Sequence, residues 1–334
     1  MNLRDPPNTL VVLWRITERC NLGCAFCAYD RTLRRARHAA DAQTVNGFGE
    51  VLAEYQRTTG VRVLVSWLGG EPLLWAPLAA VSEKYRSQHG VDLSLTTNGT
   101  RLDRSSVRAL LIRHYSEVTL SVDGFRPYHD AMRGCAGLFD ALARSISQLA
   151  AEKRAAGTGP LLRVNIVLMR GNVGTFAPLC RELAGWGIEE ISFNQLGGND
   201  RPEFFPHNRL LPEQADEFAV RLPALRTELA ARGVTLRGSG EYLRRIAASS
   251  RDARLSPADC APGRSFLFID ERGRIAPCSF TSGDYGIPLA DITGADTLMT
   301  LPARFAAQRR SRSARSCADC HSTQHFGKFA VHAP

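Results

Sequence analysis

The sequence predicts an α/β fold in which helices cover a parallel sheet. Between residues 10 and 195, six short runs rich in branched apolar residues alternate with longer helical patterns. A chain that alternates strand and helix in series builds a parallel sheet with right-handed crossovers. The 334 residues are 44% hydrophobic and 22% charged, which is typical of a globular protein with a sizeable core.

Each predicted strand is an apolar, β-branched run of the kind found in buried parallel strands. These runs span residues 10–16, 61–67, 92–96, 117–122, 161–169 and 190–195. The predicted helices have apolar residues at helical spacing, and several end near a glycine. They span residues 45–58, 76–88, 104–113, 136–154 and 174–185. Periodicity alone leaves open whether the sheet is flat or curls into a partial barrel.

The alternating pattern ends after residue 195. Glycine and proline predict a loop over residues 197–206, and a helix is expected near 212–231. Residues 266–278 have the pattern of a hairpin, because two short apolar runs flank a turn that contains glycine. We therefore expect three parts: a core over 1–205, a helical connector over 206–250, and a cysteine-containing domain over 251–334.

Charge and cysteine content limit the classes of protein. The 42 basic and 33 acidic side chains leave a net charge of +9, which favours an anionic ligand or reflects an arginine-rich proteome. The apolar run 9–14 is too short for a signal peptide, and no run approaches a membrane span. Nine clustered cysteines, an odd number, indicate metal or redox chemistry rather than disulfides. We expect a cytoplasmic protein.

Three cysteines form a first cluster directly after the first predicted strand. Cys20, Cys24 and Cys27 can hold three irons of a [4Fe–4S] cluster, which normally takes four cysteines. The fourth iron is then open to another ligand, as chemistry at the cluster requires. Spacing alone also permits a zinc site with a distant fourth ligand.

This Cys-x3-Cys-x2-Cys pattern resembles the signature of the radical S-adenosylmethionine (SAM) superfamily. Further segments that follow the second, third and fourth strands resemble the SAM-binding segments of that family, over roughly residues 8–200. The resemblance implies a partial (β/α)6 TIM-like barrel, with a [4Fe–4S] cluster and SAM at the C-terminal ends of its strands. It also implies these SAM-contacting residues: Phe26, Gly69, Gly70, Glu71, Asn98, Ser121 and Arg133.

The residue types suit these roles. Gly69 and Gly70 carry no Cβ and allow a ligand to approach the backbone. Glu71 can accept hydrogen bonds from the ammonium of SAM, and Arg133 can pair with its carboxylate. Each also has an ordinary alternative, since a glycine pair is often a turn and a charged side chain is often solvated.

Four further cysteines form a second cluster: Cys260, Cys278, Cys317 and Cys320. Four thiolates can hold zinc or a complete [4Fe–4S] cluster. Their arrangement resembles the twitch domain, a shortened SPASM domain, which implies one auxiliary [4Fe–4S] cluster that accepts or relays an electron. The Cys-x2-Cys-His sequence at 317–321 also matches c-type haem attachment, which the absence of a signal peptide disfavours. Cys180 is expected in the core, and Cys135 is a candidate hydrogen-atom donor.

The radical SAM resemblance implies cleavage of SAM to a 5′-deoxyadenosyl radical that abstracts hydrogen from a substrate. Few residues precede the first strand, so a peptide-recognition domain is not expected. We therefore expect a small-molecule substrate, such as a sugar, aminocyclitol or nucleoside of antibiotic or related natural-product biosynthesis. Its net oxidation would pass an electron to the auxiliary cluster. Alternatives are a decarboxylase, an epimerase, a peptide-modifying maturase, or a non-enzymatic zinc or iron–sulfur regulatory protein.

Polar residues after the sixth strand are the candidate substrate contacts: Asn194, Gln195, Asp200, Arg201 and Glu203. An external one-electron reductant such as flavodoxin or ferredoxin is an expected partner. The arginine-rich segments 31–37 and 309–315 have few interleaved aromatic residues, so nucleic acid is not expected as a partner. No membrane partner is expected either.

Overall fold

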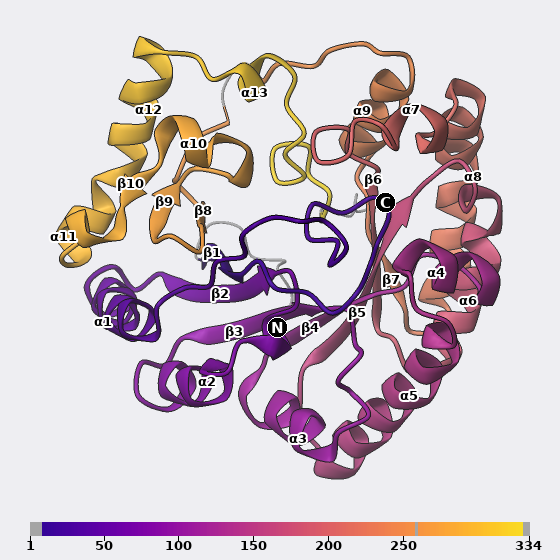
Figure 1. Cartoon of the computed structure of the whole chain (residues 1–334), viewed down its shortest axis with the longest axis horizontal. Coiled ribbons are helices and arrows are strands. Elements are labelled where there is room, and N and C mark those ends of the chain that lie inside the picture. The colour runs from indigo at the N-terminus through magenta and orange to yellow at the C-terminus, as the bar shows by residue number, and fades with distance from the viewer. Residues whose placement is uncertain (1–8, 258–259, 330–334) are drawn as a thin grey trace.

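The structure is a computed structural model that describes residues 9–257 and 260–329. Within these residues, ten strands form one sheet in the order β10-β9-β8-β1-β2-β3-β4-β5-β6-β7. Strands β1 to β7 follow one another in chain order, and each neighbouring pair is parallel. Helices surround the outside of this curved sheet (Figure 1). This part of the chain is therefore a partial TIM-like barrel.

The strands are β1 (Thr9–Thr17), β2 (Arg62–Gly69), β3 (Asp92–Thr97), β4 (Glu117–Ser121), β5 (Leu161–Leu168), β6 (Glu190–Gln195), β7 (Thr235–Leu236), β8 (Phe266–Ile269), β9 (Arg274–Ala276) and β10 (Ile287–Pro288). The helices are α1 (Ala42–Thr59), α2 (Leu78–Ser87), α3 (Ser105–His114), α4 (Arg126–Arg133), α5 (Leu138–Ala156), α6 (Phe176–Gly185), α7 (Phe205–Asn208), α8 (Pro212–Ala230), α9 (Gly240–Ser250), α10 (Ser282–Tyr285), α11 (Ala295–Met299), α12 (Leu301–Ser311) and α13 (Arg315–Ala318). All six strands predicted before residue 196 are present, with ends shifted by two residues at most. The short helices α4 and α7, and the helices α10 to α13 of the C-terminal region, were not predicted.

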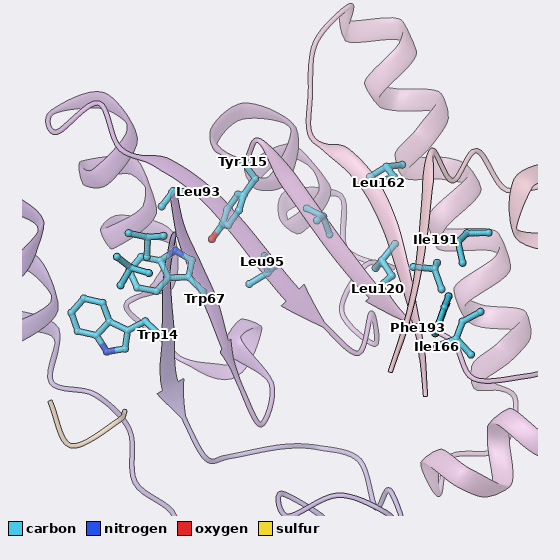
Figure 2. Close-up of a cluster of buried hydrophobic side chains, with 14 of the residues drawn as sticks. Trp14, Trp67, Leu93, Leu95, Tyr115, Leu120, Leu162, Ile166, Ile191 and Phe193 are labelled. Carbon is cyan, nitrogen blue, oxygen red and sulfur yellow. The ribbon is translucent and has the colours of Figure 1, made fainter. Parts of the chain in front are cut away.

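Alternation along the strands divides the barrel wall into an apolar outer face and a polar inner face. The outward side chains form the core beneath the helices, including Trp14, Trp67 and Phe193, none of them exposed to solvent (Figure 2). Each such burial stabilises the fold by roughly 1.5–3 kcal/mol. Many of the intervening residues are polar: Ser66 Oγ lies 3.4 Å from Ser94 Oγ, and Ser192 Oγ donates to Asn165 Oδ1 at 3.1 Å. On β1 and β2, apolar residues such as Val11 and Leu64 also take intervening positions. The inside of the barrel is therefore suited to a polar ligand.

A buried ion-pair network lies on the same inner face. Arg163 on β5 pairs with Glu117 on β4 at 3.1 Å and with Glu190 on β6. The Nε of Arg237, which follows β7, donates to the second oxygen of Glu190 at 2.7 Å. Burial raises the pKa of Glu117, and the Arg163 charge opposes this shift. Because each charge has a partner, the network joins four adjacent chain segments without an isolated buried charge.

The sheet continues from the barrel into the C-terminal region. The predicted hairpin is present as β8 and β9, and β8 pairs in parallel with β1, where Val11 lies opposite Phe266. The predicted connector 206–250 is not purely helical, because β7 within it pairs with β6. Neither pairing could be predicted from local sequence patterns, since each joins segments far apart in the chain. In the described residues, no helix has the length and apolarity needed to cross a membrane.

Candidate active site at the mouth of the barrel

Three cysteines occupy the loop that follows β1, here called the cysteine loop (residues 18–41). Cys24 is buried, and Cys20 and Cys27 are half-buried. Burial raises the pKa of the Cys24 thiol to about 12; Arg133 opposes this shift, and the Cys27 and Cys20 sulfurs add to it. The structure thus brings the three predicted ligands together. Without iron the thiols hold their protons, so cluster assembly must release protons.

Nitrogen donors point at the sulfur atoms of this loop. The backbone amide of Leu22 donates to Cys20 Sγ at 3.5 Å, and that of Tyr29 donates to Cys27 Sγ at 3.3 Å. Asn98 Nδ2 lies 3.8 Å from Cys20 Sγ. Such donors stabilise thiolates and tune the potential of an iron–sulfur cluster. Three thiols with this set of donors fit a [4Fe–4S] cluster that keeps one iron open.

The glycine pair after β2 packs against the backbone of the cysteine loop. A Cβ on Gly69 would lie 2.1 Å from the carbonyl oxygen of Thr17, and a Cβ on Gly70 would lie 2.3 Å from that of Arg19. The Gly70 amide also donates to the Thr17 carbonyl at 2.8 Å. The predicted approach of SAM to these glycines stays a prediction, and the structure shows a second reason for the missing Cβ atoms. They admit the protein's own backbone, and their lack of a Cβ holds the cysteine loop in place.

Glu71 makes contacts within the protein that were not predicted from the sequence. Its carboxylate has no exposure to solvent and accepts hydrogen bonds from the Leu73 amide, the Thr97 hydroxyl and the Asn98 amide at 2.7–3.1 Å. Burial raises the pKa of Glu71, and these donors oppose the shift. The predicted contact of Glu71 with the ammonium of SAM stays a prediction. Glu71 positions Asn98 beside Cys20.

We expect the substitution Gly70→Val to displace Arg19 and with it the neighbouring Cys20. The variant should lose roughly half of its iron together with SAM binding, because the loop that holds three irons cannot close. Iron per chain and SAM affinity, measured anaerobically after reconstitution, check this result. Gly47→Val is the matched control, since a Cβ there meets no atom within 4 Å. An iron-replete Gly70→Val protein would contradict the steric explanation, whether or not it bound SAM.

Arg133 pairs with Asp123, a residue that the sequence analysis did not consider. Its Nε and Nη2 lie 2.7 and 2.6 Å from Asp123 Oδ2, and both side chains are buried. The guanidinium also lies 5.2 Å from the centre of the Phe26 ring, with Nη1 at 3.9 Å from Cys24 Sγ. Its protein partner is thus a carboxylate at the end of β4. The pair places a fixed positive charge beside Cys24.

Asp123 is itself held by its neighbours. Its Oδ1 accepts from the Val167 amide at 2.9 Å, and its carbonyl accepts from Asn172 Nδ2 at 2.7 Å. Its amide donates to His129 Nδ1 at 3.1 Å, and burial lowers the pKa of His129 to about 4. His129 is therefore neutral at neutral pH and accepts this bond. The signal for Asp123 was present in the sequence, since it lies two residues after Ser121, which is half-buried at the end of β4.

The candidate substrate residues fall into two groups. Arg201 Nη1 reaches back to Asp30 Oδ2 on the cysteine loop at 3.1 Å, and its Nε pairs with Glu203 at 2.5 Å. Asp200 is exposed; burial raises the pKa of Cys27 and of Tyr29, and the Asp200 charge adds to both shifts. These three residues therefore lie by the cysteine loop. Asn194 instead contacts the C-terminal end of the chain, and the backbone amide of its half-buried neighbour Gln195 donates to the Tyr242 hydroxyl at 3.3 Å.

The four remaining predicted ligands meet in the C-terminal region, where Cys260, Cys278, Cys317 and Cys320 line one cavity of about 230 Å³. We call it the four-cysteine cavity. Burial raises the pKa of Cys320, and the three other thiols raise it further. Thr281 Oγ1 lies 3.2 Å from Cys278 Sγ, and the Ser322 amide donates to Cys320 Sγ at 3.4 Å. Across residues 9–257 and 260–329, no three Cys, His, Asp or Glu side chains are grouped as ligands of a single ion.

The hairpin beside this cavity contacts the cysteine loop. Glu271 in the β8–β9 turn accepts from Arg15 Nε at 2.5 Å, and Arg15 Nη1 donates to the Tyr29 hydroxyl at 3.1 Å. Of the two leftover cysteines, Cys180 is fully buried on α6, as predicted, and Cys135 is half-buried after α4. Arg15 on β1 thus links the hairpin to the cysteine loop. A partial barrel with three cysteines at its mouth defines an iron–sulfur barrel enzyme.

Comparison with known proteins agrees with this class. Residues 14–172 match the model of the Radical SAM superfamily. The chain is 26% identical to the mycofactocin maturase MftC of Mycobacterium ulcerans over 93% of its own length and 80% of that protein. It is 28% identical to the PqqA peptide cyclase of Gluconobacter oxydans, over 83% of this chain and 72% of that one. A 32% match to the Fe-coproporphyrin III synthase of Methanosarcina barkeri covers 41% of this chain and 33% of that protein.

Solved structures show the same fold. Streptococcus suis SuiB bound to SAM has a TM-score of 0.64 at 17% identity, covering 94% of this chain and 72% of that one. The structure of anSMEcpe with bound AdoMet has a TM-score of 0.65 at 16% identity, covering 96% and 88%. Residues 14–172 are thus similar to the radical SAM superfamily, whose members use a [4Fe–4S] cluster and SAM.

Proposed function

We propose that this radical SAM enzyme modifies a peptide, and that the four-cysteine cavity holds an auxiliary [4Fe–4S] cluster. The observation that carries the proposal is the extent of the similarity. The match to the PqqA peptide cyclase covers 83% of the chain, and the match to the maturase MftC covers 93%. Such lengths take in the C-terminal region as well as the barrel. We propose the boundaries 1–205, 206–250 and 251–334 for the core, the connector and the auxiliary region.

A small-molecule substrate is the second candidate. The GTP 3′,8-cyclase of Xanthomonas axonopodis is 30% identical to this chain, and its name gives a nucleotide as substrate. That match covers 54% of this chain, against 83% for the peptide cyclase. The longer matches therefore favour a peptide over the sugar, aminocyclitol or nucleoside expected from the sequence alone.

In this proposal, different residues at the barrel mouth have different roles. When bound, the first cluster supplies the electron that cleaves SAM, and an external reductant such as flavodoxin or ferredoxin replenishes it. Cys20, Cys24 and Cys27 hold that cluster, and Asn98 donates toward Cys20. Arg133, fixed by Asp123, places a positive charge next to Cys24. We assign the SAM-facing surface to Phe26, Ser121 and the loop that carries Arg201.

The substrate class can be tested through the hydrogen atom that the enzyme removes. An extract of the source organism grown in deuterated water is separated into peptides and molecules below about 1 kDa. Each fraction is incubated anaerobically with the enzyme, SAM and dithionite. We expect deuterium to enter 5′-deoxyadenosine from the peptide fraction, and protease treatment of that fraction to abolish the transfer. Deuterium transferred from the small-molecule fraction, and unaffected by protease, would contradict a peptide substrate.

A further inference from the structure

The end of the described chain enters the inner face of the barrel. Residues 322–329, here called the tail segment, follow Cys320 and return toward the middle of the sheet (Figure 1). The Phe326 carbonyl accepts from Ser239 Oγ at 2.8 Å, and the Phe329 carbonyl accepts from Arg237 Nη1 at 2.9 Å. Both donors follow β7. The barrel therefore binds the backbone of this segment through side-chain donors, as a protein binds a peptide ligand.

The side chains of the tail segment are bound as well. Lys328 Nζ donates to Asn165 Oδ1 on β5 at 2.8 Å and to Asn194 Oδ1 on β6 at 2.6 Å. The Phe329 ring lies 5.0 Å from this ammonium and 5.2 Å from the guanidinium carbon of Arg163. Lys328 is 5% exposed. A cation, an aromatic ring and two carbonyls are thus all recognised at one place on the inner face.

The choice of lysine at this position is informative. Of the 42 basic residues in the chain, three are lysines, and the other two, Lys84 and Lys153, are partly exposed on α2 and α5. Lysine has a slender stem and a compact ammonium with three donors, whereas arginine presents a wide planar fork. Two carboxamide oxygens on neighbouring strands suit the compact group. This site therefore suits a lysine side chain, although nearly all other basic residues of the chain are arginines.

The surroundings of Lys328 weaken its hold on a proton, so a cationic side chain can leave this site reversibly. Burial and the Arg163 charge lower the pKa of Lys328 to about 7, and Glu190 on β6 opposes the shift. Glu117 on β4 and Arg237 after β7 complete the charged groups of this inner face. With its charge only partly retained near neutral pH, Lys328 is held chiefly by hydrogen bonds and ring contacts.

We propose that the inner face between β5 and β6 is a peptide-binding site, which the tail segment occupies as an internal ligand until a substrate displaces it. This inference rests on the proposed peptide substrate and narrows its class to a segment with a basic side chain beside an aromatic one. A tethered ligand acts at an effective concentration of about millimolar. A substrate that displaces it must therefore make further contacts, for which the barrel mouth and the cysteine loop are available.

Lysine labelling of the iron-loaded protein tests whether the tail segment is docked. An amine-acylating reagent at about pH 7.5 can modify three lysines, and mass spectrometry separates their peptides. We expect Lys328 to react at least about tenfold more slowly than Lys84, because burial excludes the reagent. An exposed amine with a lowered pKa would instead react faster than Lys84. Equal or faster labelling of Lys328 in the unaltered protein would overturn the proposal.

A binding experiment tests whether the vacated face accepts a peptide. In the full-length variant Lys328→Glu, a carboxylate faces two carboxamide oxygens and the tail segment should leave. A fluorescent synthetic peptide with the sequence of residues 322–329 should then bind at least about tenfold more tightly than to the unaltered protein. The same peptide carrying Lys328→Glu is the control ligand, and Lys84→Glu is the control protein. Equal binding of the peptide to Lys328→Glu and to the unaltered protein would overturn the proposal.

A second variant keeps the test valid if Lys328→Glu fails to fold. Asn165→Leu combined with Asn194→Leu removes both acceptors and should make Lys328 react at least about tenfold faster, with circular dichroism and iron content unchanged. Continued protection of Lys328 in this folded variant would contradict the role of the two asparagines. None of these measurements needs turnover. Transfer of deuterium from the small-molecule fraction would thus refute the peptide substrate. The labelling and binding experiments would still decide whether the tail segment docks in the barrel.

Discussion

Replacing Cys20, Cys24 and Cys27 together by alanine is expected to abolish SAM cleavage. The three thiols converge on one loop at the barrel mouth, and no second set of three with an open fourth position occurs in the described residues. Two [4Fe–4S] clusters amount to about eight irons per chain, so the variant should retain about four. Iron analysis after anaerobic reconstitution and measurement of 5′-deoxyadenosine with dithionite as reductant check both parts.

The matched control is Cys180→Ala. Cys180 is buried on α6, away from both cysteine groups, and its removal should leave iron content and SAM cleavage unchanged. The cost of the small cavity is about 1 kcal/mol of folding stability. Formation of 5′-deoxyadenosine by the triple variant would contradict the assignment of the SAM-cleaving cluster to this loop.

The second large effect is expected from Cys317→Ala combined with Cys320→Ala. Both thiols line the four-cysteine cavity, so the variant should lose about half of its iron and still cleave SAM. A four-cysteine cluster has no open position for substrate, and the role proposed for it is electron transfer. If the net reaction is an oxidation, oxidised product should fall while 5′-deoxyadenosine continues to form. Product and 5′-deoxyadenosine, measured in the same reaction, give this ratio.

Loss of a metal site can also unfold its surroundings, so this experiment needs controls. Circular dichroism and the remaining iron show whether the barrel is intact, and labelling of Lys328 shows whether the tail segment still docks. Full product from a folded double variant would eliminate the electron-transfer role. Solvent deuterium at the substrate carbon would favour an epimerase, with half-buried Cys135 as the first hydrogen donor to replace.

The first six strands, the helices between them and the first cysteine group could be predicted because their signals are local. An apolar run marks each strand, and spacings of two or three residues mark Cys20, Cys24 and Cys27. The same local patterns could not identify Arg163 and Glu190 as an inner-face pair, since a charged residue in a sequence is usually solvated. Their burial depends on three strands that meet only in the folded barrel.

The packing of Gly70 against the cysteine loop could not be predicted for a similar reason. A glycine pair after a strand indicates that something approaches the backbone, but the pattern does not say what. In the folded chain the approaching group is the Arg19 carbonyl, which comes from a different strand end. Lys328 gave no signal either, because a single lysine near a terminus has no periodic context. Its partners Asn165 and Asn194 lie more than a hundred residues away in sequence.

The parallel pairing of β8 with β1 has a consequence for how the chain is made. β1 emerges first from the ribosome and finds β2 soon afterwards, but its other edge is covered only by residues 266–269. At about 5–20 residues per second, the 200 residues between the end of β2 at 69 and the end of β8 at 269 take about 10–40 s to synthesise. During that interval an apolar strand edge is open to pairing with other nascent chains. Slow translation and high expression should therefore favour aggregation of this protein, and co-expressed chaperones that shield strand edges should raise its soluble yield.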